Sequence, residues 1–362
     1  MDITRPFTTL AQPKKRMIEL EQHTPPTRKK IWRYLIVVVI LGLAVNLLLP
    51  KVADLRDAWS VVRGFAWWAV LLALLAEVGA YLGYGYCLRS IVAIHDYDIS
   101  VTKGALIALG SYSIGLVAGG WVSATAAMFG FMRKENINSS TSTMAGILPA
   151  LLINIAIELV AILGIIYLLI IGQLTNAQLI RYSIFLAVLT LVSVAIFAAV
   201  LFPKLAFKVA NWVFWRYARI KKKPYDPAKT QAMVTSFLNA WNGLNDGRWV
   251  KPLLGGLMFI GLDMLCLYFM FVAAGFPINP GVLFAGYGLP FLLSKIVFIF
   301  PGGIGVIEAS MAALFTSLGV PSKVGIVVII AFRLFSFWLP LLFGFLAAAI
   351  LSRGNKTPVI AD

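Results

Sequence analysis

Long apolar stretches constrain the fold of this chain more than any other feature. Several stretches with at most one charged residue approach or exceed about 20 residues, the helix length that crosses the hydrocarbon core of a bilayer. Of the 362 residues, 60% are hydrophobic and only 13% are charged. Because lipid offers no partner for backbone N–H and C=O groups, such stretches must close their hydrogen bonds internally. We therefore predict an all-α polytopic membrane protein.

About six full spans and two broken hairpins account for the apolar stretches. The spans are predicted at residues 31–49, 67–87, 145–171, 182–202, 253–274 and 324–351. Residues 104–132 are apolar but interrupted at Gly119 and Gly120. At about 1.5 Å per residue neither arm of this segment crosses the bilayer, so it is predicted to be a re-entrant hairpin. A second hairpin is expected over residues 281–318, where a full crossing is the alternative.

The second hairpin contains the sharpest break in the chain. Pro301, Gly302, Gly303 and Gly305 interrupt an apolar stretch, and none of them favours a continuous helix. Backbone groups freed by a break cannot face lipid, so the break must lie inside the protein or beside a water-filled cavity. Glu308 follows at once, and an acid at membrane depth needs a partner. Broken helices beside charged groups are typical of transporter binding sites near the bilayer midplane.

Positive charge sets the predicted orientation. The 31 Lys and Arg residues against 15 Asp and Glu give a net charge of +16. Most of the positive charge lies in residues 1–33 and 203–251, which we place in the cytoplasm. We expect a disordered basic tail over residues 1–30, a basic amphipathic segment over 203–251 and a short tail over 352–362. Both termini are then cytoplasmic, in a cell inner membrane.

The basic surface of the cytoplasmic side admits two interpretations. In the first it serves only to fix the topology, and in the second it also contacts the anionic lipids of the inner leaflet. Binding to nucleic acid is not expected, because the positive charge is explained by the topology.

The predicted transmembrane domain, residues 31–351, contains two halves of similar design. Residues 67–171 and 253–351 each hold a span, a hairpin with a Gly-Gly break and a second span, in opposite orientations. Inverted repeats with broken helices are a recurrent basis of alternating access in transporters. We therefore expect an inverted repeat, although few residues are identical between the halves.

Six ionisable residues are predicted at or near membrane depth: Glu77, Glu158, Asp263, Lys295, Glu308 and Arg333. Each would cost about 2.5–3.5 kcal/mol if it stood unpaired at the bilayer centre. We therefore expect mutual pairing or a hydrated cavity, with Glu308 and Asp263 as the partners of Arg333 and Lys295. The alternative is that these pairs only lock helices together.

An arginine is the most informative of these residues, because its guanidinium fork fits phosphate or carboxylate in a bidentate way. The predicted substrate-binding residues are Arg333, Glu308, Lys295, Asp263, Gly302, Gly303, Gly305, Gly119 and Gly120. Glu77 and Glu158 are left out because they could lie close to an interface. No catalytic residue, metal or cofactor is expected.

Three functions fit these features. A lipid translocase would take a headgroup into a polar cavity between the hairpins, and it is expected to work without a nucleotide because no G-x-x-x-x-G-K-[ST] motif is present. A membrane-embedded enzyme acting on a lipid or polyprenyl phosphate would need acids near the membrane face, where only Asp96 and Asp98 are paired. A small-solute transporter would use the same broken helices around a closed site. We expect translocation of a phospholipid, not catalysis.

A family resemblance is carried by three short segments. Residues 301–309 read Pro-Gly-Gly-Ile-Gly-Val-Ile-Glu-Ala, residues 331–334 read Ala-Phe-Arg-Leu, and Pro340 follows. Together they resemble the lysylphosphatidylglycerol synthase transmembrane (flippase-domain) family, which includes the membrane half of the multiple peptide resistance factor. The resemblance implies movement of an aminoacylated phospholipid between leaflets without a nucleotide. It also implies that Glu308 and Arg333 line a headgroup cavity.

The sequence departs from the family in two ways. Members often carry an arginine a few residues after the first Gly-Gly, whereas here none occurs before Arg133. The headgroup or the direction of transport is therefore expected to differ. The soluble aminoacyl-transferase domain of the large members is also not expected in this chain. The expected protein partner is a second copy of this chain (a homo-oligomer) or a separate lipid-modifying enzyme.

Overall fold

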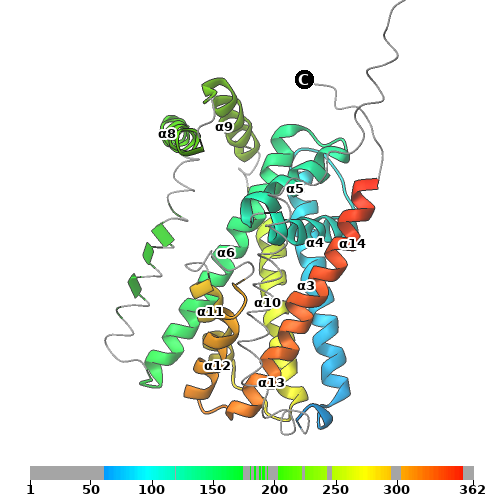
Figure 1. Cartoon of the computed structure of the whole chain (residues 1–362), viewed down its shortest axis with the longest axis vertical. Coiled ribbons are helices and arrows are strands. Elements are labelled where there is room, and N and C mark those ends of the chain that lie inside the picture. Colours follow the sequence, from blue (N-terminus) through cyan, green and yellow to red (C-terminus); the bar gives the residue numbers. More distant parts are fainter. Residues whose placement is uncertain are drawn as a thin grey trace, which may run out of the picture. The chain divides into compact units, whose positions relative to one another are not determined.

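The computed structural model describes residues 61–118, 120–173, 203–221, 225–242, 247–294 and 303–353, with isolated positions between 180 and 194. Within these ranges every regular element is a helix, as predicted (Figure 1). The elements are α3 (Trp67–Ala93), α4 (Val101–Ala118), α5 (Trp121–Lys134), α6 (Ser139–Ile170), α8 (Pro203–Lys221), α9 (Pro227–Asn242), α10 (Val250–Ala273), α11 (Pro280–Ser294), α12 (Val306–Ser317), α13 (Ser322–Arg333), the π-helix η3 (Leu334–Trp338) and α14 (Leu339–Arg353).

Four of the described helical segments are long and apolar enough to cross a membrane. They are α3, α6, α10 and the continuous run α13–η3–α14, which match the spans predicted at 67–87, 145–171, 253–274 and 324–351. The predicted spans 31–49 and 182–202, the tail 1–30 and nearly all of the tail 352–362 lie outside the described residues, apart from isolated helical positions.

Helices α3 and α10 pack along each other more extensively than any other pair. Small residues allow the close approach of their backbones: a Cβ atom added at Gly255 would lie 2.6 Å from the Cys87 amide nitrogen, and one at Gly83 would lie 2.9 Å from the Met258 Cβ. Membrane helices pack through such small residues, because lipid gives no hydrophobic driving force for association. The pair brings Glu77 of α3 and Asp263 of α10 into the protein interior.

Helices α4 and α5 form the first hairpin, and the chain breaks at the predicted position. Gly120 has φ +78°, a value that favours glycine, and its N–H donates to the Gly115 carbonyl at 2.6 Å. At the other end of the hairpin, Lys103 at the start of α4 forms an ion pair with Glu135, which follows α5. The two arms therefore begin and end side by side.

Helices α11 and α12 form the second hairpin. Gly303 and Gly305 have φ +66° and +84°, and α12 begins directly after them at Val306. The arms pack closely, because a Cβ atom at Gly286 would overlap the ring of Phe315. The prediction of a helix break is confirmed at residues 303–305, while Pro301 and Gly302 lie outside the described residues.

Each hairpin packs against a long helix of the opposite predicted half. Helix α4 lies along α14, where the Ser113 hydroxyl donates to the Leu341 carbonyl at 3.1 Å. Helix α11 lies along α6, where the Asn279 amide donates to the Tyr167 hydroxyl at 2.9 Å. Lys134 of α5 also donates to the Leu351 carbonyl at 3.0 Å, near the end of α14. Both hairpins are thus held by long helices distant in sequence.

The last long helix contains a π-helical turn just before Pro340. Proline has no N–H and cannot bond the carbonyl one turn earlier, so the regular hydrogen-bond ladder is interrupted there. The turn η3 widens the helix at this point and follows Arg333 directly. The sequence predicts a kink at Pro340, and the structure adds the π-turn on its N-terminal side.

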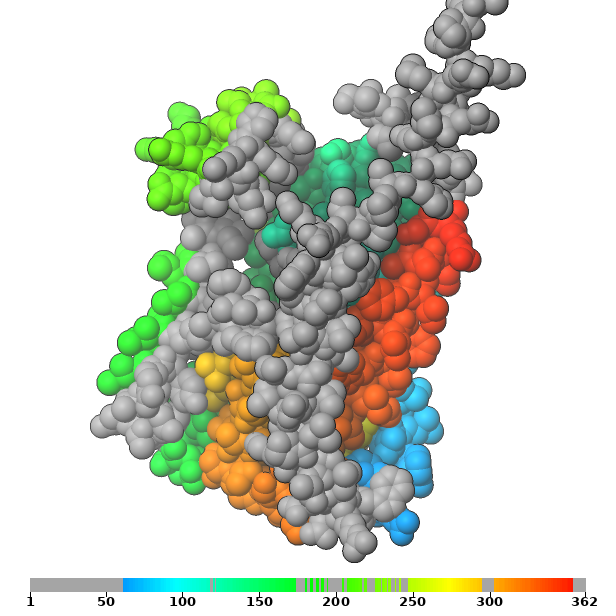
Figure 2. Space-filling model, in the orientation of Figure 1, coloured from blue at the N-terminus to red at the C-terminus, as the bar shows by residue number. Residues whose placement is uncertain are grey.

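The outer faces of several helices are apolar. On α14 the exposed apolar residues are Leu342, Phe343, Leu346 and Ile350. This helix, red to orange in Figure 2, lies at the surface of the molecule. Such a stripe suits contact with lipid tails. In the basic segment, α9 packs on α6 and buries Leu238, whereas α8 exposes Trp212.

Candidate functional site

A buried ion pair joins the second hairpin to the last long helix. Glu308 lies in the first turn of α12, and Arg333 is the final residue of α13. The Arg333 Nε donates to the Glu308 Oε1 at 2.6 Å, and the two side chains are only 5% and 11% exposed. The structure thus brings together the acid and the arginine that the sequence predicts as partners.

The second oxygen of Glu308 holds the helix break in place. Its Oε2 accepts the N–H of Gly305 at 2.6 Å. This contact is half of a capping box, in which the third residue of a helix bonds back to the N-cap amide. The N-terminal end of the α12 dipole also favours a negative charge here. Glu308 is therefore shared between the backbone of the break and the guanidinium of Arg333.

An aromatic ring covers the other side of Arg333. The guanidinium carbon lies 4.4 Å from the centroid of the Phe337 ring, which belongs to η3. Such a cation–π contact is worth about 2 kcal/mol when it is desolvated, and Arg333 is only 4% exposed. Phe337 in turn meets the Tyr112 ring of α4 edge to face at 6.4 Å.

A second buried polar cluster lies beside this pair. The Tyr287 hydroxyl of α11 donates to the Asp263 Oδ2 of α10 at 2.5 Å. Glu77 of α3 is also a hydrogen-bond partner of Asp263. All three residues are buried.

The two clusters are close enough to act on each other electrostatically. Arg333 interacts with Asp263, and Tyr112 interacts with both Arg333 and the two carboxyls. Six helices therefore supply one polar region inside a largely apolar protein: α3, α4, α10, α11, α12 and α13. A buried network of this kind is a candidate functional site, because an ionisable side chain inside a membrane protein costs free energy and is rare.

Comparisons with known proteins agree with the motif at the break. The model of the lysylphosphatidylglycerol synthase TM region matches residues 34–344. This chain belongs to that family. Among curated proteins, it is 33% identical over 98 residues to a UPF0104 membrane protein of Pyrococcus horikoshii, covering 27% of this chain and 29% of the relative. A UPF0104 membrane protein of Methanocaldococcus jannaschii is 28% identical over 132 residues, covering 36% of this chain and 39% of the relative.

Five glycines and Lys295 complete the site that the sequence predicts for this member of the lysylphosphatidylglycerol synthase TM region family. Gly303 and Gly305 form the break that precedes Glu308. Gly120 lies at the tip of the first hairpin, in the bend between α4 and α5. Gly119, Gly302 and Lys295 lie outside the described residues.

Sequence reasoning missed four residues in or beside this polar region, one of which is Tyr112 of α4. The sequence predicts Glu77 at or near membrane depth but not as a site residue, and the structure adds that it is 4% exposed and is a hydrogen-bond partner of Asp263. Tyr287 carried a usable signal, because a buried tyrosine hydroxyl in an apolar stretch needs a partner. Phe337 gave no such signal, since an aromatic residue in a membrane helix is ordinary.

Arg133 does not take the place of the arginine that many members of the family carry after the first Gly-Gly. Arg133 lies near the end of α5, and its Nη1 donates to the Ile137 carbonyl at 2.9 Å. It therefore caps the loop at the base of the hairpin.

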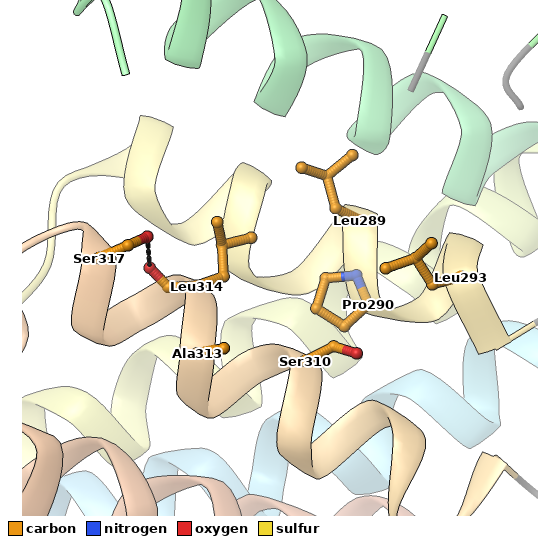
Figure 3. Close-up of a pocket in the computed structure, with 7 residues that line it drawn as sticks. All are labelled: Leu289, Pro290, Leu293, Ser310, Ala313, Leu314 and Ser317. Carbon is orange, nitrogen blue, oxygen red and sulfur yellow. Dashed lines mark hydrogen bonds between the residues drawn. The ribbon is translucent and has the colours of Figure 1, made fainter. Parts of the chain in front are cut away.

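A cavity of about 350 Å³ lies between the arms of the second hairpin (Figure 3). Its lining is mostly apolar and comes from Leu289, Pro290, Leu293, Ser310, Ala313, Leu314 and Ser317. Residues 310, 313, 314 and 317 form one face of α12. Glu308 precedes Ser310 by two residues, a turn of about 200° around a helix, so the ion pair lies on the opposite face. The predicted polar cavity was placed between the two hairpins, whereas this cavity lies within one of them.

Proposed function

We propose that this chain moves a phospholipid, or another lipid with a phosphate-bearing headgroup, between the two leaflets of a membrane. The observation that carries the proposal is the buried Glu308–Arg333 pair at a helix break. Family membership supports a lipid-related role, because the family is named for a protein region associated with lysylphosphatidylglycerol.

A phosphate would compete with Glu308 for the same guanidinium. Arginine binds carboxylate and phosphate with the same fork, so one anion can replace the other without leaving the buried charge unpaired. For Arg333, the exchange avoids the large cost of a lone charge in a low-dielectric interior. Glu308 would keep its bond to the Gly305 amide while Arg333 binds the headgroup. The acyl chains would stay in the lipid.

An inverted repeat would supply the movement. Helix α4 packs on α14 and α11 packs on α6, which is the reciprocal arrangement that two inverted halves would give. In this proposal the hairpins α4–α5 and α11–α12 are re-entrant, and one half rocks against the other. The Glu308–Arg333 pair is almost closed to solvent in the structure, so the movement must open it to each leaflet in turn.

The proposed setting is a cell inner membrane with both termini in the cytoplasm. Helix α8 supports the orientation, because it carries basic residues together with exposed Trp212 and Trp215. Such a composition suits the headgroup region of an anionic leaflet.

Transport is favoured over catalysis by the state of the loop acids. Asp98 bonds Arg89 at 3.1 Å, and both Asp96 and Asp98 are exposed. Exposure to solvent gives neither acid the altered environment that general acid–base chemistry requires.

The proposal is tested by transbilayer movement of a tail-labelled phosphatidylglycerol in vesicles of phosphatidylethanolamine and phosphatidylglycerol. We expect wild type to accelerate the movement, and Arg333→Ala and Glu308→Ala to lose at least tenfold in rate, equivalent to about 1.4 kcal/mol. Lys103→Ala, which removes an ion pair at the base of the first hairpin, is the matched control and should stay near the wild-type rate. Equal rates for wild type, Arg333→Ala and Glu308→Ala would overturn the proposal.

A further inference from the structure

We propose that the Glu77–Asp263 pair is a proton-binding site that couples lipid movement to a proton gradient. This inference rests on the proposed lipid transport. Tyr287 is the positioning residue of this site. The site is separate from the Glu308–Arg333 pair but lies within its electrostatic reach.

The two buried carboxyls lie close enough to share a proton, and Tyr287 fixes the position of one of them. Two ionised carboxylates have only acceptor oxygens, so a hydrogen bond between Glu77 and Asp263 exists only when one of them is protonated. Asp263 already accepts from the Tyr287 hydroxyl at 2.5 Å, which favours its ionised form. The proton therefore lies on Glu77.

An unpartnered oxygen marks where exchange can occur. Glu77 is 4% exposed, and its Oε2 has no hydrogen-bond partner among the residues that the structure describes. A buried polar atom without a partner is costly, and native proteins keep few of them. A water molecule that donates to this oxygen would satisfy it during a transport cycle. The group thus combines a bound proton with an open acceptor.

Among the described residues, few other charges lie near the Glu77–Asp263 pair. The groups of the described residues that face it from the packed helices are Tyr81 on α3, Tyr112 on α4, Cys266 on α10, Tyr287 on α11 and Arg333 on α13. Helix α6 also packs against α3 and α10, and it carries the buried acid Glu158. Of these groups, only Arg333 is positively charged.

Arg333 connects the proton to the lipid. When Glu77 loses its proton, the pair gains a second negative charge and attracts Arg333 more strongly. When Glu77 is protonated, Arg333 is released from this competition and can bind a phosphate. The proton and an anionic headgroup therefore bind together and cross in the same direction.

The proton balance is simple. A proton from the solution on one side forms an O–H bond with the Glu77 carboxylate, and that bond breaks when the proton leaves to the opposite solution. No electron moves and no other covalent bond changes. For a headgroup with one negative charge, the combined cargo carries no net charge.

Infrared spectroscopy tests the proton site without relying on transport. In purified full-length protein, the C=O stretch of a protonated carboxyl should be present at neutral pH. Glu77→Gln should lose it, and the matched variant Glu158→Gln should retain a band at the wild-type position. If Glu77→Gln does not fold, Asp263→Asn gives the same test. It removes the carboxylate that accepts the hydrogen bond from the protonated Glu77. An unchanged carboxyl band in a folded Glu77→Gln or Asp263→Asn protein would overturn the site.

A gradient experiment tests the coupling. In vesicles of phosphatidylethanolamine and phosphatidylglycerol, tail-labelled phosphatidylglycerol should accumulate in the leaflet toward which protons flow. Glu77→Gln should lose this gradient dependence, while Glu158→Gln should keep it. Movement that follows a sodium gradient at equal pH, or that ignores a pH gradient in wild type, would overturn the coupling. If wild type moved no labelled lipid although the carboxyl band was lost in Glu77→Gln, the lipid function would fail and the proton site would stand.

Discussion

The two broken hairpins of this protein differ in where they place charge. In the α4–α5 hairpin, the ion pair Lys103–Glu135 lies at the open end of the arms, partly exposed. In the α11–α12 hairpin, the carboxylate of Glu308 lies at the break itself and meets the buried Arg333. Both hairpins use a glycine with positive φ immediately before the second arm.

The difference separates the requirements of the fold from those of the site. A helix break inside a membrane protein needs a glycine and a packed setting, and the first hairpin shows that it needs no charge at the tip. The charge at the second break is therefore an addition to the fold. The proposed lipid function would account for the retention of this costly buried charge.

The largest expected difference between the hairpins is in stability. Arg333→Ala leaves Glu308 buried without its partner and should lower the free energy of unfolding by about 3–5 kcal/mol. Lys103→Ala removes a partly exposed pair and should lower it by less than about 1 kcal/mol. Denaturant unfolding of the detergent-solubilised protein measures both. Equal losses in the two variants would remove the distinction between the breaks.

The two glycines at the tips should respond alike. An added Cβ has open space at both Gly120 and Gly305, so alanine there acts only through the positive φ. We expect each substitution to lower the free energy of unfolding by about 1–3 kcal/mol, the usual cost of such strain. The same unfolding measurement applies. A neutral Gly120→Ala would show that the first tip can relax, and would break the parallel between the hairpins.

The aromatic contacts sharpen the comparison on a smaller scale. Phe337 lies 4.4 Å from the Arg333 guanidinium, whereas Phe131 lies 5.9 Å from the Lys134 ammonium. Phe337→Leu should cost about 1 kcal/mol more than Phe131→Leu, because the buried cation–π contact is the stronger one. The excess should vanish when both substitutions are repeated in Arg333→Ala. An excess that persists would assign it to packing alone.

Salt should have the smallest effect, and only on one hairpin. At about 1 M salt the Debye length falls to about 3 Å, which screens exposed pairs. We expect the coupling energy of Lys103 and Glu135, measured by a double-mutant cycle, to decrease with salt. The coupling of Glu308 and Arg333 should change little, because both side chains are buried. A strong salt dependence of the second coupling would mean that water reaches this pair freely.

Much of the fold follows from local sequence. Apolar length predicts α3, α6, α10 and the last long helix, and glycine predicts both breaks. The helix ends differ from the predictions by a few residues, because polar residues such as Thr102 and Ser139 extend α4 and α6 beyond their apolar parts. Hydropathy does not report such extensions.

The candidate site was only partly predictable. The Glu308–Arg333 pair follows from the cost of unpaired charges, since each needs a partner at the same depth. The bond between Tyr287 and Asp263 depends on how α11 and α10 are rotated toward each other, which hydropathy does not specify. The π-turn before Pro340 likewise depends on how the freed backbone is accommodated.

The most direct test of the central claim is photo-cross-linking of a phosphatidylglycerol that carries a diazirine on its headgroup. Full-length protein in vesicles is irradiated, and the adducts are located by mass spectrometry. If the headgroup binds at the Glu308–Arg333 pair, we expect adducts on the peptides around these two residues. The adducts should be lost in Arg333→Ala and retained in Lys103→Ala. Adducts confined to the α4–α5 hairpin or to α14, unchanged in Arg333→Ala, would contradict it.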